Sequence, residues 1–373
     1  MVARRSGHRL PALALRRALG DADRTGHPPT ARCPLGRPVG TRRRTPHVID
    51  FRYHLVSLAA VLIALSIGIV LGAGPLNDNI GSTLSGEVTK LRQEKDALRA
   101  QGNDQRRQID GRDAYDEATL DTVVQGRLTD RQVNVVALPQ AADEDVTAIR
   151  DTLEQAGASV GETVEVTSAW ASTDDQLTST RSTAGQAALQ LLQVGPAVPD
   201  GAQRVDQALA VILTGRTKAG SPDKAPPSDR EAAWSELRDA GLVKGSDTPP
   251  AAAELVVLVG GPVPATTADS TDAVDREAER IAGSWVALTH LVQTHADGTV
   301  LAAAEADTGT SDASPLTMAR TPGSLADRVS TVDVPSIPMG RAAVVLALVE
   351  QSDGGSGDYG LGQSADGPVP TLK

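Results

Sequence analysis

The chain has 373 residues and a formal net charge of −11, and this charge is divided unevenly along it. Residues 1–47 hold eleven of the 36 basic residues and two of the 47 acidic ones, which leaves 25 basic and 45 acidic residues on the remainder. So acidic a body argues against nucleic acid as a partner. The single cysteine, Cys33, lies in the basic part, so the remainder forms no disulfide and must fold by packing alone. Residues 1–47 are also rich in Pro, Gly and Thr, which predicts a disordered basic extension.

The stretch from Leu55 to Gly74 contains no charged residue. About 20 apolar residues in a helix, with a rise of about 1.5 Å each, cross the roughly 30 Å hydrocarbon core of a bilayer. The sequence therefore predicts a transmembrane anchor over residues 48–75, which Pro75 ends. A cleaved signal peptide is the alternative, but the apolar stretch is long for one, and proline would follow the cleavage point.

The charges on the two sides of this span predict its orientation. Arg42, Arg43, Arg44 and Arg52 precede it, whereas Asp78 follows it. Basic residues stay on the cytoplasmic side of a membrane span. We therefore expect a single-pass protein of the plasma membrane, with its N-terminus in the cytoplasm and the rest of the chain outside.

A motif of charged and aromatic residues opens the span: Asp50, Phe51, Arg52, Tyr53 and His54. An interfacial aromatic residue beside an arginine that reaches lipid headgroups is a common anchor arrangement. The alternative is a docking site for a membrane partner.

After Pro75, apolar residues recur with a four-three spacing at Leu84, Val88, Leu91 and Leu98, and Lys95 lies in the same row. This heptad spacing among charged residues predicts a short coiled-coil stalk within residues 80–116. Gly102 and Gln105 weaken the row beyond two to three heptads. The stalk predicts self-association, and a solvated amphipathic helix is the alternative.

Strand and helix patterns alternate over residues 127–351, and the strongest strand is apolar on both faces. This pattern predicts an extracytoplasmic α/β domain with a largely parallel, Rossmann-like sheet covered by helices. The expected strands are 133–138, 160–166, 255–259, 299–303 and 329–334. The expected helices are 143–155, 183–193, 205–213, 229–240, 272–294 and 340–351. Residues 352–373 are rich in Gly, Ser and Pro, which predicts a flexible tail.

Two blocks carry a resemblance to a known family. Ile49-Asp50-Phe51-Arg52-Tyr53-His54-Leu55-Val56-Ser57-Leu58 opens the anchor, and Gly340 to Leu348 with Gly357, Tyr359 and Gly360 closes the chain. Both are similar to the actinobacterial copper-transporter family typified by mycobacterial copper transport protein B. Members of that family open with methionine where this chain has Val48. Since GUG encodes valine and also initiates translation, we expect the natural protein to begin at position 48; a basic arm that binds anionic lipid headgroups is the alternative.

The resemblance implies copper, and the ligands that the sequence offers for copper are few. Outside the basic extension, the candidates away from the anchor are His290, His295, Met318 and Met339. The two histidines are five residues apart, which places them about 140° apart around a helix, so they are poorly placed to chelate one ion. His295 suits a helix C-terminus and the methionines suit packing.

No nucleophile, base and orienting residue can be assembled, so the sequence predicts a protein that is not an enzyme. Gly260-Gly261 ends the strongest strand and predicts a plain turn, because it lacks the pattern of a phosphate-binding loop. The resemblance implies an envelope protein of copper efflux or tolerance, with the outer envelope as another possible location. The alternative is an adaptor that positions a membrane or peptidoglycan-remodelling partner.

Overall fold

The computed structural model describes residues 51–72, 76–198, 201, 203–265, 272–306, 312–324 and 328–371, without the side chains of 76–83 and 272–275. The basic extension, Cys33 and Asp50 lie outside the described residues. The chain divides into two units, Met1–Val88 and Thr89–Lys373.

Helix α1 (Phe51–Gly72) forms where the anchor is predicted. Every residue of α1 is exposed, and its mean hydropathy reaches 2.7. Among the described residues it is the one helix long and apolar enough to cross a membrane.

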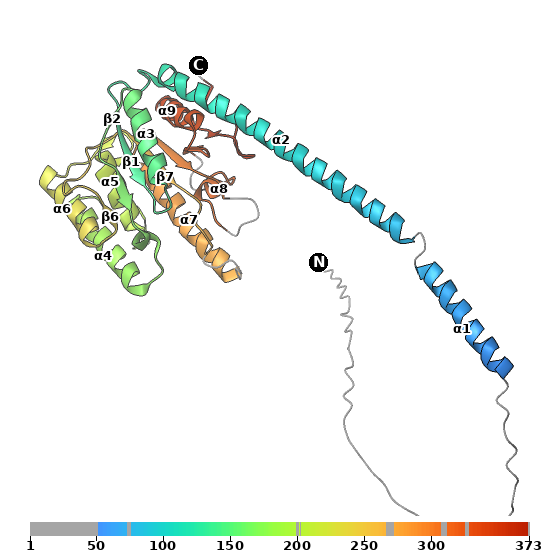
Figure 1. Ribbon diagram of the computed structural model, residues 1–373. Coiled ribbons are helices and arrows are strands. Elements are labelled where there is room, and N and C mark those ends of the chain that lie inside the picture. The colour runs from blue at the N-terminus through green and yellow to red at the C-terminus, as the bar shows by residue number, and fades with distance from the viewer. Residues whose placement is uncertain are drawn as a thin grey trace, which may run out of the picture. The chain divides into compact units, whose positions relative to one another are not determined.

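Helix α2 (Leu76–Val124) is 49 residues long and contains the predicted stalk (Figure 1). The predicted helix is therefore present. Most of its side chains from Leu84 onward are exposed, and their pairing in a coiled coil stays a prediction. Its last turns differ, because Leu120 and Val124 are buried among domain side chains. The packed domain therefore begins before residue 127.

A mostly parallel sheet forms the centre of the domain, as predicted. Its strand order is β10-β9-β8-β7-β1-β3-β6, β2 pairs with β1, and β6 alone runs antiparallel, against β3. The strands are β1 (Gln132–Ala137), β2 (Ser159–Val160), β3 (Val164–Val166), β6 (Val243–Lys244), β7 (Leu255–Gly260), β8 (Gly298–Ala303), β9 (Ser330–Val332) and β10 (Asp358–Tyr359). The register pairs Val135 with Val257 and Val257 with Val300. The chain adds β3 on one side of β1 and then β7 on the other, so the topological switch point lies between β1 and β7.

Helices cover both faces of this sheet (Figure 1). Side chains alternate along β7: Val256 and Leu258 pack with α4, α5, α6 and α7, whereas Leu255, Val257 and Val259 pack with α3, α9 and the end of α2. The helices are α3 (Asp143–Gln155), α4 (Asp175–Leu191), α5 (Arg204–Thr214), α6 (Pro227–Asp239), α7 (Asp272–Gln293), α8 (Pro315–Ala319) and α9 (Pro338–Ser352), with a 3-10 turn η1 (Ser168–Ala171).

Local signals explain most differences from the predicted elements. The strand expected at 160–166 is divided into β2 and β3, and the helix expected at 183–193 begins at Asp175 because Asp174 accepts hydrogen bonds from the Gln176 and Leu177 amides, each at 3.0 Å. A hairpin of β4 (Arg216–Lys218) and β5 (Ser221–Pro222) was not predicted.

The largest difference concerns the closing segment, which is ordered rather than a flexible tail. Strand β10 pairs in parallel with β9, and Tyr359 is buried. Composition is a poor guide here because contacts with distant residues hold the segment.

Candidate functional site

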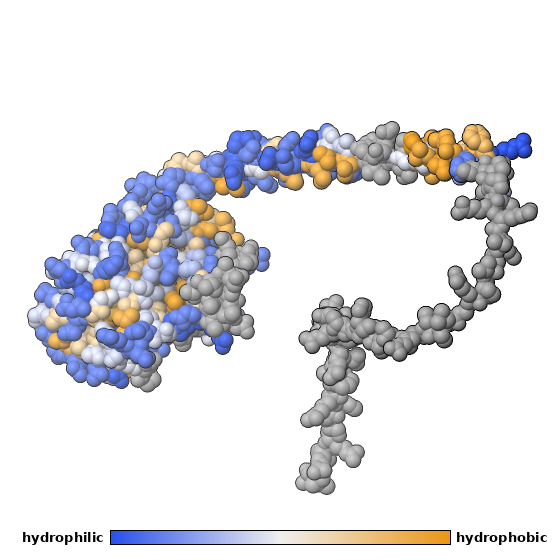
Figure 2. Space-filling view, turned by 60° about the horizontal axis from the view of Figure 1, so that its bottom comes forward, coloured by the Kyte–Doolittle hydropathy of each residue, from blue (hydrophilic) through white to orange (hydrophobic). Residues whose placement is uncertain are grey.

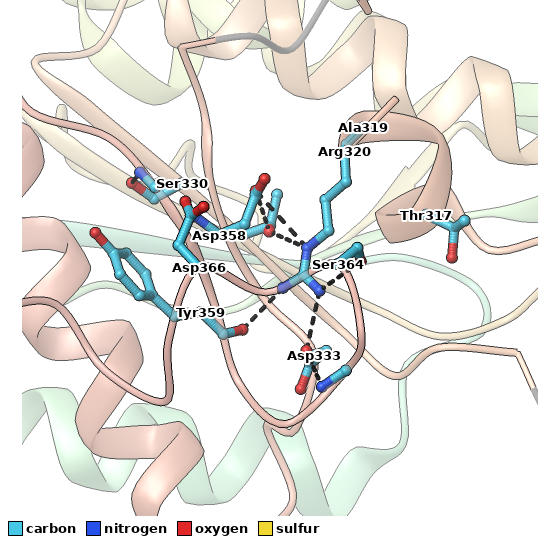
Figure 3. Close-up of polar contacts among 12 residues, drawn as sticks. Thr317, Ala319, Arg320, Ser330, Asp333, Asp358, Tyr359, Ser364 and Asp366 are labelled. Carbon is cyan, nitrogen blue, oxygen red and sulfur yellow. Dashed lines mark hydrogen bonds and ion pairs between the residues drawn. The ribbon is translucent and has the colours of Figure 1, made fainter. Parts of the chain in front are cut away.

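A network of ion pairs lies at the carboxyl ends of β8 and β9, around the guanidinium of Arg320 (Figure 3). We call it the Arg320 cluster, and its members come from four segments of the chain. They are Glu305, Arg320, Thr331, Asp333, Asp358, Tyr359 and Ser364. Parallel strands bring these segments together, because their carboxyl ends meet at one edge of the sheet.

Helix α8 places Arg320 in the cluster. Ser314 caps this short helix by accepting a hydrogen bond from the Thr317 amide at 3.3 Å, and Pro315 follows in the first turn, where proline fits. Arg320 comes directly after the helix, and 1% of its side chain is exposed. A charge so deeply buried requires partners.

The guanidinium finds partners on all of its nitrogens. Nη1 donates to Asp333 Oδ2 at 2.9 Å and to Ser364 Oγ at 3.2 Å. Nη2 donates to the Tyr359 carbonyl at 2.8 Å, and Nε donates to Thr331 Oγ1 at 2.7 Å. With each nitrogen occupied by the chain itself, Arg320 is poorly placed to bind an external anion.

Contacts within the chain also occupy the carboxylate of Asp333. Its side chain is 2% exposed, and besides Arg320 it accepts hydrogen bonds from the Leu361 amide at 2.8 Å and the Gly362 amide at 2.9 Å. Gly360 makes this wrap possible: its φ of +133° disfavours other residues, and a Cβ there would collide with the Asp333 carboxylate. The cluster therefore fastens the closing segment to the sheet.

Tyr359 fastens the other side of β10. Its hydroxyl donates to Glu350 on α9, while its carbonyl accepts from Arg320. Burial, followed by the hydrogen bond and negative charge of Glu350, raises the pKa of Tyr359, so the phenol stays protonated at neutral pH.

The Arg320 cluster was not predicted, although its signals are present in the sequence. Glu305 is the first acid after the predicted strand 299–303, Asp333 is the one acid within the predicted strand 329–334, and Tyr359 and Gly360 belong to the block that carries the family resemblance. What the sequence does not reveal is that Arg320, 13 residues from Asp333 and 39 from Tyr359, meets them both.

The structure describes all four predicted metal candidates, His290, His295, Met318 and Met339. Among the residues that the structure describes, no group of three or more His, Cys, Asp or Glu side chains is placed to hold an ion. Met318 is half-buried and packs against the core, and Met339 is half-buried at the start of α9. Both positions suit the packing role predicted for methionine.

His295 follows the end of α7 and is buried, with 3% exposed. Its Nδ1 lies 2.7 Å from the Leu291 carbonyl, and because a carbonyl only accepts, Nδ1 carries the proton. Burial lowers the pKa of His295, and the hydrogen bond to Leu291 opposes this with a smaller effect. His295 thus contacts the helix C-terminus, as expected, but as a neutral ring with an unpartnered Nε2 among the described residues. A lone Nε2 is one ligand, whereas copper sites need several.

His290 lines a separate feature, a cavity of about 800 Å³ at the amino end of β8 and β9. The side chains around it are mainly polar and include Gln293, Asp297, Arg328 and Gln351. The cavity lies at the opposite end of the strands from the Arg320 cluster.

The switch point, where open α/β sheets usually bind ligands, is closed by backbone. Gly261 follows β7 and lies so near the loop after β1 that a Cβ on it would collide with the Gln140 carbonyl. Gly260-Gly261 therefore serves as a close turn.

In the anchor motif, Phe51 and Tyr53 are 77% and 79% exposed at the start of α1. Arg52 and His54 are also exposed, so every described member of the motif is available to lipid or to a partner.

Comparisons with known proteins point in one direction. The family model described as "Copper transport outer membrane protein, MctB" matches residues 48–370. A copper transporter MctB of Mycobacterium bovis is 28% identical over 324 residues, which are 85% of this chain and 98% of the relative. A copper transporter MctB of Mycobacterium leprae is 28% identical over 327 residues, again 85% of this chain and 98% of the relative.

Proposed function

We propose, since this chain belongs to the family of the copper transport outer membrane protein MctB, that it lowers the copper load of the cell from within the cell envelope. One observation carries the proposal: the match runs from residue 48 to residue 370 and so includes α1, α2 and the domain together. The relatives named as copper transporters align over 98% of their own length.

Efflux fits this chain better than sequestration does. A protein that stores copper needs thiolate, thioether or imidazole ligands in groups. In the described part of the chain, Met318 is half-buried against the core, Met339 is half-buried, His290 lines the cavity and His295 is a single buried ring. The proposed role is therefore to support copper export as part of an envelope assembly, without a resident copper ion in the domain.

We further propose that α1 remains as an anchor, with the domain outside the plasma membrane. Arg52 precedes the apolar span and Asp78 follows it, which favours that orientation. A reporter enzyme active only outside the cytoplasm, fused after Gln125, should be active. Activity restricted to a cytoplasmic reporter at this position would reverse the orientation. The family description names the outer membrane, so fractionation of the envelope should accompany the fusion.

Deletion and complementation test the proposed function. Cells that lack the protein should accumulate more copper, measured by mass spectrometry, and should grow poorly in added copper. The full chain should restore both. A matched variant with His290→Asn, Met318→Leu and Met339→Leu should restore them equally, because these side chains hold no copper in this proposal. Failure of that variant at normal protein level would instead support sequestration.

A second candidate function is that of an adaptor, and α2 favours it. A 49-residue helix with mostly exposed side chains suits a spacer that positions a membrane or peptidoglycan-remodelling partner. In that case, deletion should alter envelope integrity or cell separation while the copper content of the cell stays unchanged.

A further inference from the structure

One row of apolar side chains on α2 is exposed in the part of the chain that the structure describes. Leu84, Val88, Leu91 and Leu98 are 65%, 40%, 61% and 67% exposed. Figure 2 shows orange patches along a mostly hydrophilic α2. Burying large aliphatic side chains contributes roughly 1.5–3 kcal/mol each, so leaving four in water forgoes a large stabilisation.

The spacing of this row defines heptad positions. Val88 occupies an a position, and Leu84, Leu91 and Leu98 occupy d positions. A β-branched residue at a with leucine at d favours two-stranded parallel coiled coils. Lys95 occupies the next a position, where a polar residue lowers stability but specifies register and the number of strands.

The charges beside the row distinguish a parallel pair from an antiparallel one. Glu87 and Glu94 occupy g positions, and Arg92 and Arg99 occupy e positions. In a parallel pair in register, each g residue faces the e residue five positions later on the other helix. Glu87 then meets Arg92 of the partner subunit, and Glu94 meets Arg99 of the partner subunit. An antiparallel pair would instead place Glu against Glu and Arg against Arg.

Contacts within one chain leave these charges available. Lys90 lies 4.0 Å from Glu94 along the helix, with side-chain exposures of 67% and 55%. A pair so exposed contributes little, and a carboxylate accepts more than one partner. Glu87, Arg92 and Arg99 are all exposed as well.

We infer that two copies of this chain associate through residues 84–99 of α2 as a parallel, in-register coiled coil. Both opposite-charge pairs form twice, once on each side of the apolar row. The occupant of the row is a second copy because its charge pattern complements itself in this arrangement. The inference goes beyond the proposed function and does not depend on copper.

Disulfide trapping in membranes tests the geometry. In the full chain with Cys33→Ser, Leu84→Cys and Leu98→Cys, made separately, should each give a disulfide-linked dimer. The two positions are about 21 Å apart along the helix at about 1.5 Å per residue. In an antiparallel pair, position 84 and position 98 therefore cannot each lie beside the same position of the second copy. Gln93→Cys, at the f position on the opposite face, is the matched control. Equal trapping at Gln93, or trapping at neither leucine position, would overturn the inference.

Charge reversal tests the pairing. With Leu91→Cys as the probe, Glu87→Arg with Glu94→Arg should reduce the trapped homodimer severalfold, and so should Arg92→Glu with Arg99→Glu. Coexpression of the two differently tagged chains should restore trapping as a mixed dimer. Asp96→Arg, at a b position, is the control and should change little. Undiminished homodimers in both reversed variants would overturn the charge pairing, because only an antiparallel or charge-independent contact predicts them.

Discussion

The two ends of the parallel sheet differ in how their polar groups are partnered. At the carboxyl ends of β8 and β9, Arg320 and Asp333 are each 1–2% exposed in their side chains and each hold several partners. At the amino end, His295 Nε2, Gln293 Oε1 and Thr299 Oγ1 are buried without a hydrogen-bond partner among the described residues. A cavity of about 800 Å³ lies at that end.

This difference indicates which edge of the sheet has polar groups available to bind a ligand. Open α/β sheets usually bind ligands beyond the carboxyl ends of their strands. Here the closing segment occupies that edge around Asp333, and Gly261 closes the switch point against Gln140. At β8 and β9 the edge that is usually functional serves stability, and buried groups without a hydrogen-bond partner among the described residues lie at the opposite edge; Gln140 Oε1, after β1, is one such group at the carboxyl edge.

The largest expected effect is at the well-partnered end. Asp333→Ala should lower the free energy of unfolding by about 3–5 kcal/mol, because it leaves Arg320 buried without its principal counter-charge. Denaturant titration of the full chain in detergent, followed by tryptophan fluorescence, measures this. The three tryptophans, Trp170, Trp234 and Trp285, are all buried in the domain and report on it alone.

Glu305→Gln is the matched control for Asp333→Ala. Glu305 also faces Arg320, at 3.4 Å, but its side chain is 36% exposed. The expected loss is below about 1 kcal/mol. Equal losses in the two variants would show that the cluster does not depend on the buried pair.

A smaller effect is expected from Gly360→Ala, at about 1–3 kcal/mol, because the added Cβ meets the Asp333 carboxylate and the backbone is left-handed there. Gly354→Ala separates the two causes. Gly354 has a φ of +82° and open space around its Cβ position, so it carries the backbone cost alone. The Gly360 variant should therefore lose more stability than the Gly354 variant in the same titration. A smaller loss would show that the close approach of Gly360 to the Asp333 carboxylate does not contribute to stability.

At the amino end, His295 should make stability depend on pH. Burial lowers its pKa in the folded chain below the ordinary 6.5, so the unfolded chain takes up the proton first as the pH falls. Stability should therefore fall as the pH drops through about 6.5, by at most about 1.4 kcal/mol per pH unit from this residue. His295→Asn keeps a donor toward Leu291 and should flatten the dependence between pH 7 and 5. An unchanged slope would assign the dependence to other groups.

The smallest expected effect is that of copper itself. Calorimetry of the full chain should show no stoichiometric tight site, and added copper should leave the unfolding temperature unchanged. A ligand at 100 times its dissociation constant would stabilise the fold by about 2.7 kcal/mol, which is easily measured. Such a shift, lost in a His290→Asn or His295→Asn variant, would move the functional site to the amino end of the sheet.

The sequence predicts those parts of the fold that depend on local patterns. Leu255 to Val259 is apolar on both faces and is a central strand, and Asp272 onward has helical spacing and forms α7. Strand β10 was missed because its glycine-rich surroundings indicate flexibility, whereas contacts with distant residues hold it in place, among them the pairing with β9 and the hydrogen bond from Arg320 to the Tyr359 carbonyl, 39 residues apart.

The candidate site was predicted less well for the same physical reason. The weak supply of copper ligands was visible in the composition, and the position of His295 at a helix end was expected. Its burial and neutral form were not, because they depend on how α7 packs against β8. The meeting of Arg320 and Asp333 likewise follows from sheet topology, which spacing along the chain does not encode.

The members of the Arg320 cluster are translated at different times, and this affects how the domain folds. Arg320 and Asp333 leave the ribosome before residues 358–364, which complete their shell of partners. Until those residues emerge, the edge of the sheet holds a partly solvated arginine and aspartate, and β9 is paired with β8 alone. Final folding of the domain therefore waits until residues 358–364 have emerged, and a chain cut short after α9 would present this edge to the quality-control proteases of the cell.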